Sequence, residues 1–311
     1  GSNLIYFGPG VHNLPNDTLF VPSGTTVYID GGARVYGNIF TEGAHDVNIF
    51  GRGEVHPDGR GAGVWVRRSK NVRIDGIVVS QLPIGQCDSV ELTNVKSISY
   101  YGWGDGMDVF SSSNVILDGV FCRNSDDCAA VYASTQGFKG GSNNVLVKNA
   151  TLWADVAHPI NIGGHGDPNG MDTVQNVTFR NIDILDQAEK QIDYQGCLAI
   201  NPGDNTLVRN ITFENIRIED FRNGQLVNFR ISFNPKYCVS TGRGIQNVLV
   251  KDVTYNGSGE NLSIIAGYDE NHKISGIRFV NLVVNGRKIT DDMPGKPKWY
   301  KTGDMAGIFV G

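Results

Sequence analysis

The stretch NVRIDGI at residues 71–77 decides the fold, because its pattern returns along most of the chain. Each copy begins with Asn or a close substitute, and aliphatic residues then alternate with polar ones. Clear copies begin at Asn114, Asn144, Asn176, Asn210 and Asn247, and weaker ones at Asp46, Asn94 and Gly276. Successive copies begin 20 to 37 residues apart. Self-similarity at this period indicates stacked units that bury a shared core only as an array.

Each unit is predicted to contain short strands. The runs VLV at 145–147 and TFR at 178–180 have a period near two, and Gly, Asn and Asp interrupt each run. The unequal intervals argue against a propeller. We predict an all-β, single-stranded parallel β-helix over residues 1–285, which a C-terminal segment, residues 286–311, caps or wraps. The repeated Asn is expected to form a ladder along the axis, and the glycines to occupy the corners.

The composition excludes several classes of protein. Of 311 residues, 40 are Gly, but they have no three-residue period, which excludes collagen. The net charge of −5, without a cluster of Lys and Arg, argues against nucleic acid as a partner. No run of 18 apolar residues occurs, so we expect no membrane-spanning helix.

The chain ends and the cysteines bear on its location. The chain begins with GS and without Met, so we expect a secreted or periplasmic protein whose signal peptide has been removed. The five cysteines form no CxxC pair and are odd in number, which favours buried thiols over a disulfide scaffold. The sequence leaves the oligomeric state open.

Ionisable residues recur at one register of the repeat. Those that lie 11 to 14 positions after the Asn of their copy are Asp105, Asp126, Asp127, His158, Lys190 and Arg222. Equivalent positions on successive coils stack roughly 4.8 Å apart. Carboxylates at that distance repel by about 3 kcal/mol, which raises one pKa and separates a general acid from a general base. For Lys190 and Arg222 we favour solvated turn positions.

Asp126 and Asp127 pose a geometric problem. Neighbouring residues of a regular strand point to opposite faces, so both cannot face outward from a strand. Either the pair sits at a bend or one Asp is structural.

Residues 105–131 resemble a known family. The runs DGMD at 105–108, SNV at 113–115 and DDCAAV at 126–131 are similar to the Asn-Thr-Asp-Gly and Asp-Asp-Cys motifs of polygalacturonases, the family 28 glycoside hydrolases. The runs TLW at 151–153 and HPIN at 158–161 resemble the related family 49, the dextranases and isopullulanases.

The resemblance implies a right-handed parallel β-helix and an inverting mechanism. Asp126 would protonate the leaving oxygen, and Asp105 and Asp127 would activate water. Inverting enzymes hold their carboxyl groups roughly 6.5–9.5 Å apart, so Asp105 is expected to splay away from Asp126. No cofactor or metal is expected.

The family's site histidine has two candidates. His165 matches the Gly-His-Gly motif as a string, whereas His158 fits by register and is preferred. The Arg-Ile-Lys motif that grips a uronate carboxylate is not recognisable: the corresponding coil reads KQIDY at 190–194, and Arg230 has no following Lys. Without paired cations, a neutral, α-linked glycan is favoured over polygalacturonate.

Further substrate contacts are expected from flat rings and from the coils beside the aspartates. The candidates are Tyr101, Trp103, Tyr132, Trp153, Lys190 and His165. For Trp153, packing between turns is an equal alternative. The expected partner is a polysaccharide.

Two other functions remain open from the sequence. One is a calcium-dependent polysaccharide lyase or epimerase, and the other is a non-catalytic glycan-binding β-helix. The loop DPNGMD at 167–172 has a calcium-like composition but lacks the spacing of an EF-hand, and an ordinary turn is favoured there.

Overall fold

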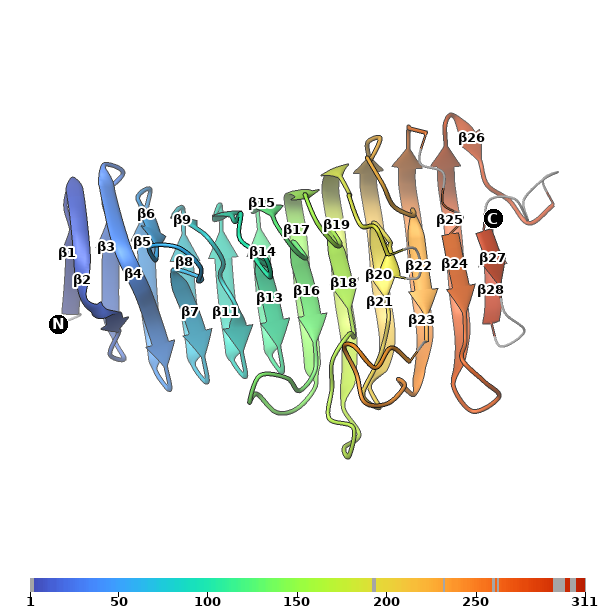
Figure 1. Ribbon diagram of the computed structural model, residues 1–311, viewed down its shortest axis with the longest axis horizontal. Helices are drawn as coiled ribbons and strands as arrows, with labels where there is room; N and C mark the ends of the chain where they lie inside the picture. Colours follow the sequence, from blue (N-terminus) through green and yellow to red (C-terminus); the bar gives the residue numbers. More distant parts are fainter. Residues whose placement is uncertain are drawn as a thin grey trace.

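The protein is a right-handed parallel β-helix, with β1 (Asn3–Phe7) near one end and β25 (Lys273–Val284) near the other (Figure 1). The computed structural model describes residues 3–191, 194–231, 233–258, 261, 263–292, 300–302 and 306–310. Within these ranges no segment forms an α-helix. The predicted fold class is therefore confirmed.

Three parallel sheets run along the axis. The first, which carries the site, consists of β7 (Val64–Arg67), β10 (Ile84–Gly85), β13 (Met107–Phe110), β16 (Ala129–Tyr132), β18 (Ile160–Ile162), β20 (Leu198–Ile200), β22 (Val227–Arg230), β24 (Ser263–Ala266) and β27 (Tyr300–Thr302). The second begins with β1, β3 (Thr25–Ile29), β5 (His45–Gly51), β8 (Lys70–Asp75), β11 (Asp88–Thr93) and β14 (Ser113–Asp118). The third contains parts of β2 (Gly10–Phe20) and β4 (Ala33–Glu42), then β6 (Glu54–His56), β9 (Val78–Val79), β12 (Lys96–Ile98) and β15 (Phe121–Asn124).

Later coils join the second and third sheets through long bent strands. These are β17 (Ser142–Ala154), β19 (Thr173–Asp186), β21 (Leu207–Ile218), β23 (Gly244–Tyr255) and β25. Within β17, the pairing skips Asn144 and Asn149, which have φ of 58° and 55°. Asn enters this left-handed region more readily than other residues with a side chain, and so forms the corners.

The repeated asparagines form the predicted ladder. Asn144 donates to Asn114 at 2.7 Å, Asn210 to Asn176 at 3.2 Å, and Asn247 to Asn210 at 3.4 Å. We call this column the asparagine ladder. Asn thus occupies most of these corners, because its amide both tolerates the turn and bonds the next coil. Gly, which we expected at corners, takes the equivalent position at Gly276, with φ of 69°.

The core consists of the inward-facing residues of all three sheets. Aliphatic side chains alternate with exposed ones along each strand, and a row of rings stacks through the later coils. Phe213 stacks on Phe179 at 5.8 Å and on Phe229 at 5.9 Å. All five cysteines are buried and unpaired, as predicted.

The loop 133–141, between β16 and β17, folds back over earlier coils of the first sheet. Phe138 stacks on Phe110 at 5.9 Å, and the Arg68 guanidinium lies 4.9 Å from the centre of the Phe138 ring. Gly85 leaves the space for this ring, since an added Cβ would lie 2.3 Å from it. The loop therefore bridges β10 and β13 from outside.

In the C-terminal segment the chain first reverses direction and then adds further parallel strands to the sheets. β26 (Arg287–Lys288) pairs antiparallel with β25, while β27 and β28 (Ala306–Val310) pair in parallel with β24 and β25. Residues 293–299 and 303–305 lie outside the described residues. The boundary at residue 285 stays a prediction.

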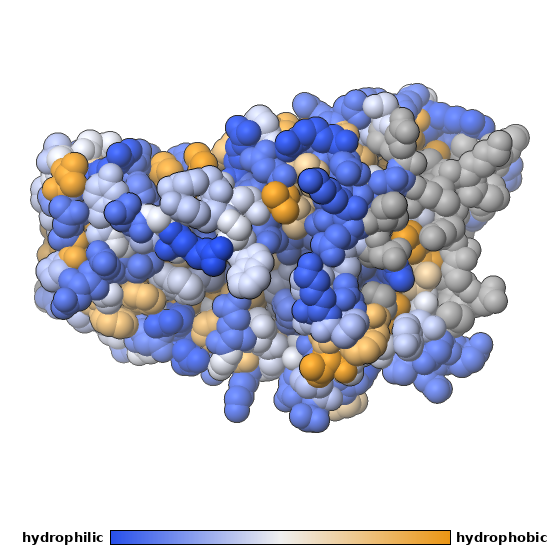
Figure 2. Space-filling view, viewed as in Figure 1, coloured by the Kyte–Doolittle hydropathy of each residue, from blue (hydrophilic) through white to orange (hydrophobic). Residues whose placement is uncertain are grey.

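The surface is mostly polar. In Figure 2, hydrophilic residues cover most of the visible face, and hydrophobic ones form small separate patches. Among the described residues, no helix has the length and apolar character needed to cross a membrane.

Candidate active site

Asp126 and Asp127 lie on the bend between β15 and β16. The bend frees both side chains from the alternation of a regular strand, which resolves the geometric problem posed by their adjacency. Asp105 approaches them from the loop that precedes β13, one coil earlier. One carboxylate oxygen from each of the three lies within 4.8 Å of the others. The structure thus brings the three predicted aspartates together.

Asp127 is held by four hydrogen bonds. Its Oδ1 accepts from the backbone N–H of His158 at 3.0 Å and from the ring Nδ1 at 2.7 Å. Its Oδ2 accepts from the Tyr132 hydroxyl at 2.8 Å and the Asn161 amide at 3.0 Å. Burial would raise the pKa of Asp127, but the charge of His158 and these bonds outweigh burial and lower that pKa to about 2. Asp127 is therefore a carboxylate at neutral pH.

The pKa of the adjacent Asp126 shifts in the opposite direction. Burial, followed by the negative charges of Asp127 and Asp105, raises the pKa of Asp126 to about 8. Asp126 therefore holds a proton at neutral pH. Two neighbouring carboxyl groups with opposite protonation are the arrangement that general acid–base catalysis needs.

A fourth carboxyl group, Asp108 on β13, completes what we call the acid site: Asp105, Asp108, Asp126 and Asp127. Asp108 is only 6% exposed, and its carboxyl group forms a hydrogen bond with that of Asp105. Burial raises the pKa of Asp108 to about 8, and burial together with the charge of Asp108 raises the pKa of Asp105 well above its usual range. Asp105 thus differs from the ionised base that we expected.

Neither Asp108 nor Asn161 was assigned a role from the sequence. In the first sheet, Ala130 pairs with Asp108 on one side and with Asn161 on the other, so the three lie in one column. The neighbouring Met107 and Val109 belong to the core. The period of two along β13 could have placed Asp108 on the outward face, three residues after Asp105.

The expected splay of Asp105 away from Asp126 stays a prediction. One oxygen of each residue lies within 4.8 Å of the other, whereas the roughly 6.5–9.5 Å typical of inverting enzymes is the separation of whole carboxyl groups.

The two candidate histidines occupy different positions. His158 is 2% exposed and lies against Asp127, as preferred from its register. His165 follows β18, and its ring packs edge-on against Tyr132, with centroids 5.0 Å apart. His165 therefore adjoins the site through Tyr132, and it lies close to Asp204 and Cys238.

The predicted aromatic contacts fall into two groups. Tyr101 and Trp103 are 42% and 80% exposed on the loop before Asp105, where they offer flat faces to a sugar. The Arg60 guanidinium lies 5.7 Å from the Trp103 ring centre. Tyr132 differs from the expectation: it is 5% exposed and positions Asp127 through its hydroxyl.

Trp153 and Lys190 were also expected to contact substrate. The Arg123 guanidinium lies 3.9 Å from the centre of the Trp153 ring on β17, which supports the alternative that this ring packs between turns. Lys190 is exposed before β20. Arg222 is exposed, in keeping with a turn position, and it pairs with Asp155 at 2.9 Å and with Asp186 at 2.5 Å.

Beyond Asn161, the column of outward residues continues with neutral side chains. Ala199 on β20 pairs with Asn161, and Asn228 on β22 pairs with Ala199. Arg230 is the last residue of β22. By its register in the sequence, this coil corresponds to residues 190–194, of which residues 192 and 193 lie outside the described residues. The strand itself comes later, at Leu198–Ile200, because the intervening turn is long.

The calcium-like loop forms turn-type bonds. Asp172 Oδ2 accepts from the backbone N–H of Ser134 at 3.3 Å and of Asp167 at 3.1 Å. Asp167 Oδ1 accepts from the N–H of Asn169 at 2.9 Å. These bonds support the interpretation of residues 167–172 as an ordinary turn.

The fold and the acid site define the class of protein as a right-handed parallel β-helix with a cluster of carboxyl groups at one sheet. The chain belongs to the glycosyl hydrolases family 28, whose model matches residues 64–293. The resemblance found in the sequence is therefore confirmed.

Among curated relatives, a polygalacturonase of Juniperus ashei is 26% identical over 67% of this chain and 39% of its own length. The chain spans about half the length of other curated relatives that it matches. Among solved structures, the Yersinia enterocolitica family 28 exopolygalacturonase has a TM-score of 0.74 at 13% identity, over 99% of this chain and 72% of that one. Dex49A from Penicillium minioluteum has a TM-score of 0.62 at 14% identity, over 99% of this chain and 60% of that one. At these identities the structures support the fold alone.

Proposed function

We propose that the protein is an inverting glycoside hydrolase that cleaves α-glycosidic bonds of a polysaccharide or oligosaccharide. The observation that carries this proposal is the pair of opposed pKa shifts on one bend: Asp126 up to about 8 and Asp127 down to about 2. Membership of family 28 supports hydrolysis as the reaction.

In the proposed mechanism, one carboxyl group donates a proton and the other accepts one. Asp126 donates its proton to the leaving glycosidic oxygen, while Asp127 takes a proton from the attacking water. The nearest oxygens of Asp105 and Asp127 lie within 4.8 Å, close enough for one water to bond both. After the bond breaks, Asp127 releases its proton to solvent and Asp126 regains one.

The stereochemical outcome is open to a direct test. The ionised Asp127 beside a protonated Asp126 is compatible with inversion and with retention, because both mechanisms use one protonated and one ionised carboxyl group, and the family resemblance supports inversion. Proton NMR during the first minutes of hydrolysis reports the anomer that forms first. We expect the β-anomer from an α-linked substrate, and an initial α-anomer would overturn the inverting assignment.

For the substrate, we propose a neutral sugar at the cleavage site. The support is the neutral column of Asn161 and Ala199, where a uronate would require a cation. The printed names of relatives favour polygalacturonate as the second candidate.

A panel of neutral α-glucans, polygalacturonate and branched galacturonans distinguishes these candidates by the reducing ends released. We expect more product from a neutral glycan, and activity confined to polygalacturonate would overturn the neutral assignment. Unsaturated, ultraviolet-absorbing ends would instead indicate a lyase. Binding without release of product would indicate a glycan-binding module. A polymeric substrate agrees with the predicted secreted or periplasmic location, which stays a prediction.

A further inference from the structure

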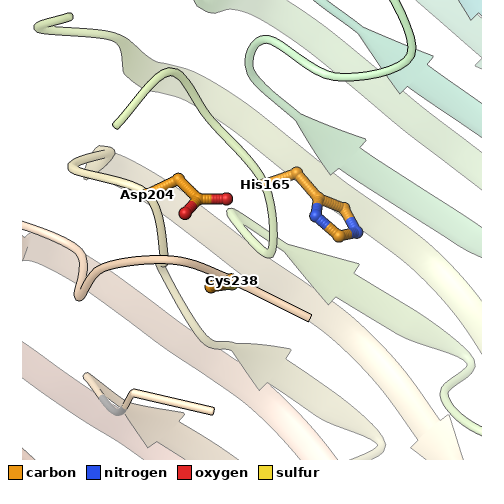
Figure 3. Close-up of side chains that lie close together, drawn as sticks. All are labelled: His165, Asp204 and Cys238. Atoms are coloured by element: carbon orange, nitrogen blue, oxygen red, sulfur yellow. The ribbon is translucent and has the colours of Figure 1, made fainter. Parts of the chain in front are cut away.

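His165, Asp204 and Cys238 converge at the edge of the first sheet (Figure 3). Each follows a different strand of three successive coils: His165 comes after β18, Asp204 after β20 and Cys238 after β22. One potential ligand atom from each lies within 4.8 Å of the others. In Figure 3 the carboxylate of Asp204 points toward His165, with Cys238 beside it. The cluster is distinct from the acid site.

Backbone hydrogen bonds hold the three loops in place. Gly203 donates to Gly163 at 3.1 Å, which ties the β20 loop to the β18 loop. Asp204 donates from its backbone N–H to Ser240 at 2.9 Å, which ties the β20 loop to the β22 loop. The convergence is therefore built into the stacking of the coils.

The immediate surroundings leave room for the thiol and fix the carboxylate. An added Cβ at Gly203 would lie 2.4 Å from the Cys238 Sγ, so that the absence of a side chain at Gly203 admits the thiol. Asp204 Oδ1 accepts from the backbone N–H groups of Val239 at 2.8 Å and Ser240 at 3.3 Å. These bonds orient the carboxylate and leave Oδ2 without a bond from either amide.

The donor set is selective. A thiolate, an imidazole and a carboxylate are the three ligand types that zinc takes, and a thiolate is a poor ligand for calcium or magnesium. Tetrahedral zinc holds such ligand atoms about 3.3–3.8 Å apart, from bonds of about 2.0–2.3 Å. Atoms within 4.8 Å of one another exceed that separation by at most about 1–1.5 Å.

We propose that His165, Asp204 and Cys238 form a binding site for Zn²⁺ or a similar borderline divalent cation, with the fourth position open to water. On binding, the Cys238 thiol loses its proton to solvent and the thiolate bonds the metal. The metal would clamp three loops that are also joined by hydrogen bonds, among them one from the Cys238 thiol to the Gly164 carbonyl at 3.2 Å. Because His165 packs against Tyr132, which bonds Asp127, the clamp borders the acid site.

Zinc titration of the metal-free protein tests this proposal without any assay of hydrolysis. After dialysis against a chelator, calorimetry with ZnCl₂ is expected to give one equivalent per chain, and zinc is expected to raise the Tm. The same titration with CaCl₂ is expected to show no binding at this site. With Co²⁺, the spectrum is expected to contain a sulfur-to-cobalt charge-transfer band.

Three variants locate the site. Cys238→Ser and His165→Gln are each expected to weaken zinc binding about 100-fold or more, since even outer partners of a metal contribute 10- to 100-fold. Cys87→Ser is the matched control, because Cys87 is also a buried thiol that donates to a backbone carbonyl, and it is expected to bind zinc as the wild type does. If Cys238→Ser does not fold, the partly exposed His165→Gln decides the outcome. Absence of zinc binding in the wild type, or equal binding in the wild type and His165→Gln, would overturn the proposal.

Discussion

Two columns of polar side chains cross the coils of this protein, and they differ in charge and in extent. The asparagine ladder repeats on successive coils, is neutral, and gives each amide a partner above or below. The acid site is confined to two coils and gathers four carboxyl groups, in which burial and the charge of Asp127 raise the pKa of the other three. A repeated column stabilises the array, whereas a column that interrupts the repeat concentrates unfavourable charge. That interruption is where chemistry is possible.

Asp126→Asn should give the largest effect, a loss of kcat of at least 100-fold, because a general acid contributes about 10²–10⁴ in rate. The folded-state pKa of Asp126, about 8, lies above the unfolded value of about 3.9. Its contribution to stability is therefore complete below the unfolded pKa and is lost as the pH rises through about 8. Since Asn cannot ionise, the Tm of the variant should exceed that of the wild type at pH 8, but not at pH 3.

Kinetics with the best substrate and thermal unfolding at both pH values check this prediction. Asp75→Asn, which alters an exposed carboxylate paired with Arg52, is the control and should retain full activity. Undiminished turnover in Asp126→Asn would remove Asp126 from the mechanism.

The pH profile of kcat/KM tests the opposed shifts. Activity should fall above about pH 8, as Asp126 loses its proton, and near pH 2, as Asp127 gains one. Tyr132→Phe removes one hydrogen bond to Asp127, so the acidic limb should move to higher pH, with about 10-fold less activity on that side. The alkaline limb should stay in place. An unmoved acidic limb would show that Tyr132 does not set the pKa of Asp127, and the exposed Tyr6→Phe serves as control.

Trp103→Ala should raise KM about 3- to 10-fold with little change in kcat, because an exposed ring adds binding energy of about 1 kcal/mol but takes no part in proton transfer. Tyr28→Ala, an exposed aromatic residue near the N-terminal end, is the matched control. A fall in kcat with constant KM would instead indicate that Trp103 acts on the transition state.

The smallest effect on activity is expected in the asparagine ladder. Asn210→Ala should lower the free energy of unfolding by about 1–2 kcal/mol, because Ala at φ of 57° is strained and two ladder bonds are lost. Asn210→Gly relieves the strain and should lose less. Denaturant unfolding measures both, while kcat and KM should match the wild type. Equal losses in the two variants would mean that the amide bonds, rather than the backbone, set the stability of the corner.

The fold was predictable because the repeat itself indicates its elements: one Asn in each copy marks a corner, and the alternation of aliphatic and polar residues marks each strand. The site was predictable in part, since register aligned Asp105 with Asp126 and Asp127. The role of Tyr132 in holding Asp127 was not predictable, because the sequence does not show which aromatic rings on the outer face become buried beneath loops. The raised pKa of Asp105 was not predictable, because it depends on burial and on the neighbouring Asp108, whose own burial the sequence does not show.

The loop 133–141 has a consequence for how the molecule forms. In a solenoid each coil normally touches only its neighbours, so coils can assemble one after another as the chain emerges. Here Phe138 covers Gly85 and Phe110, and Arg68 lies against the same ring. The outer surface of coils made early is therefore completed only after residue 138 has been synthesised. This loop links coils that a simple array would leave independent.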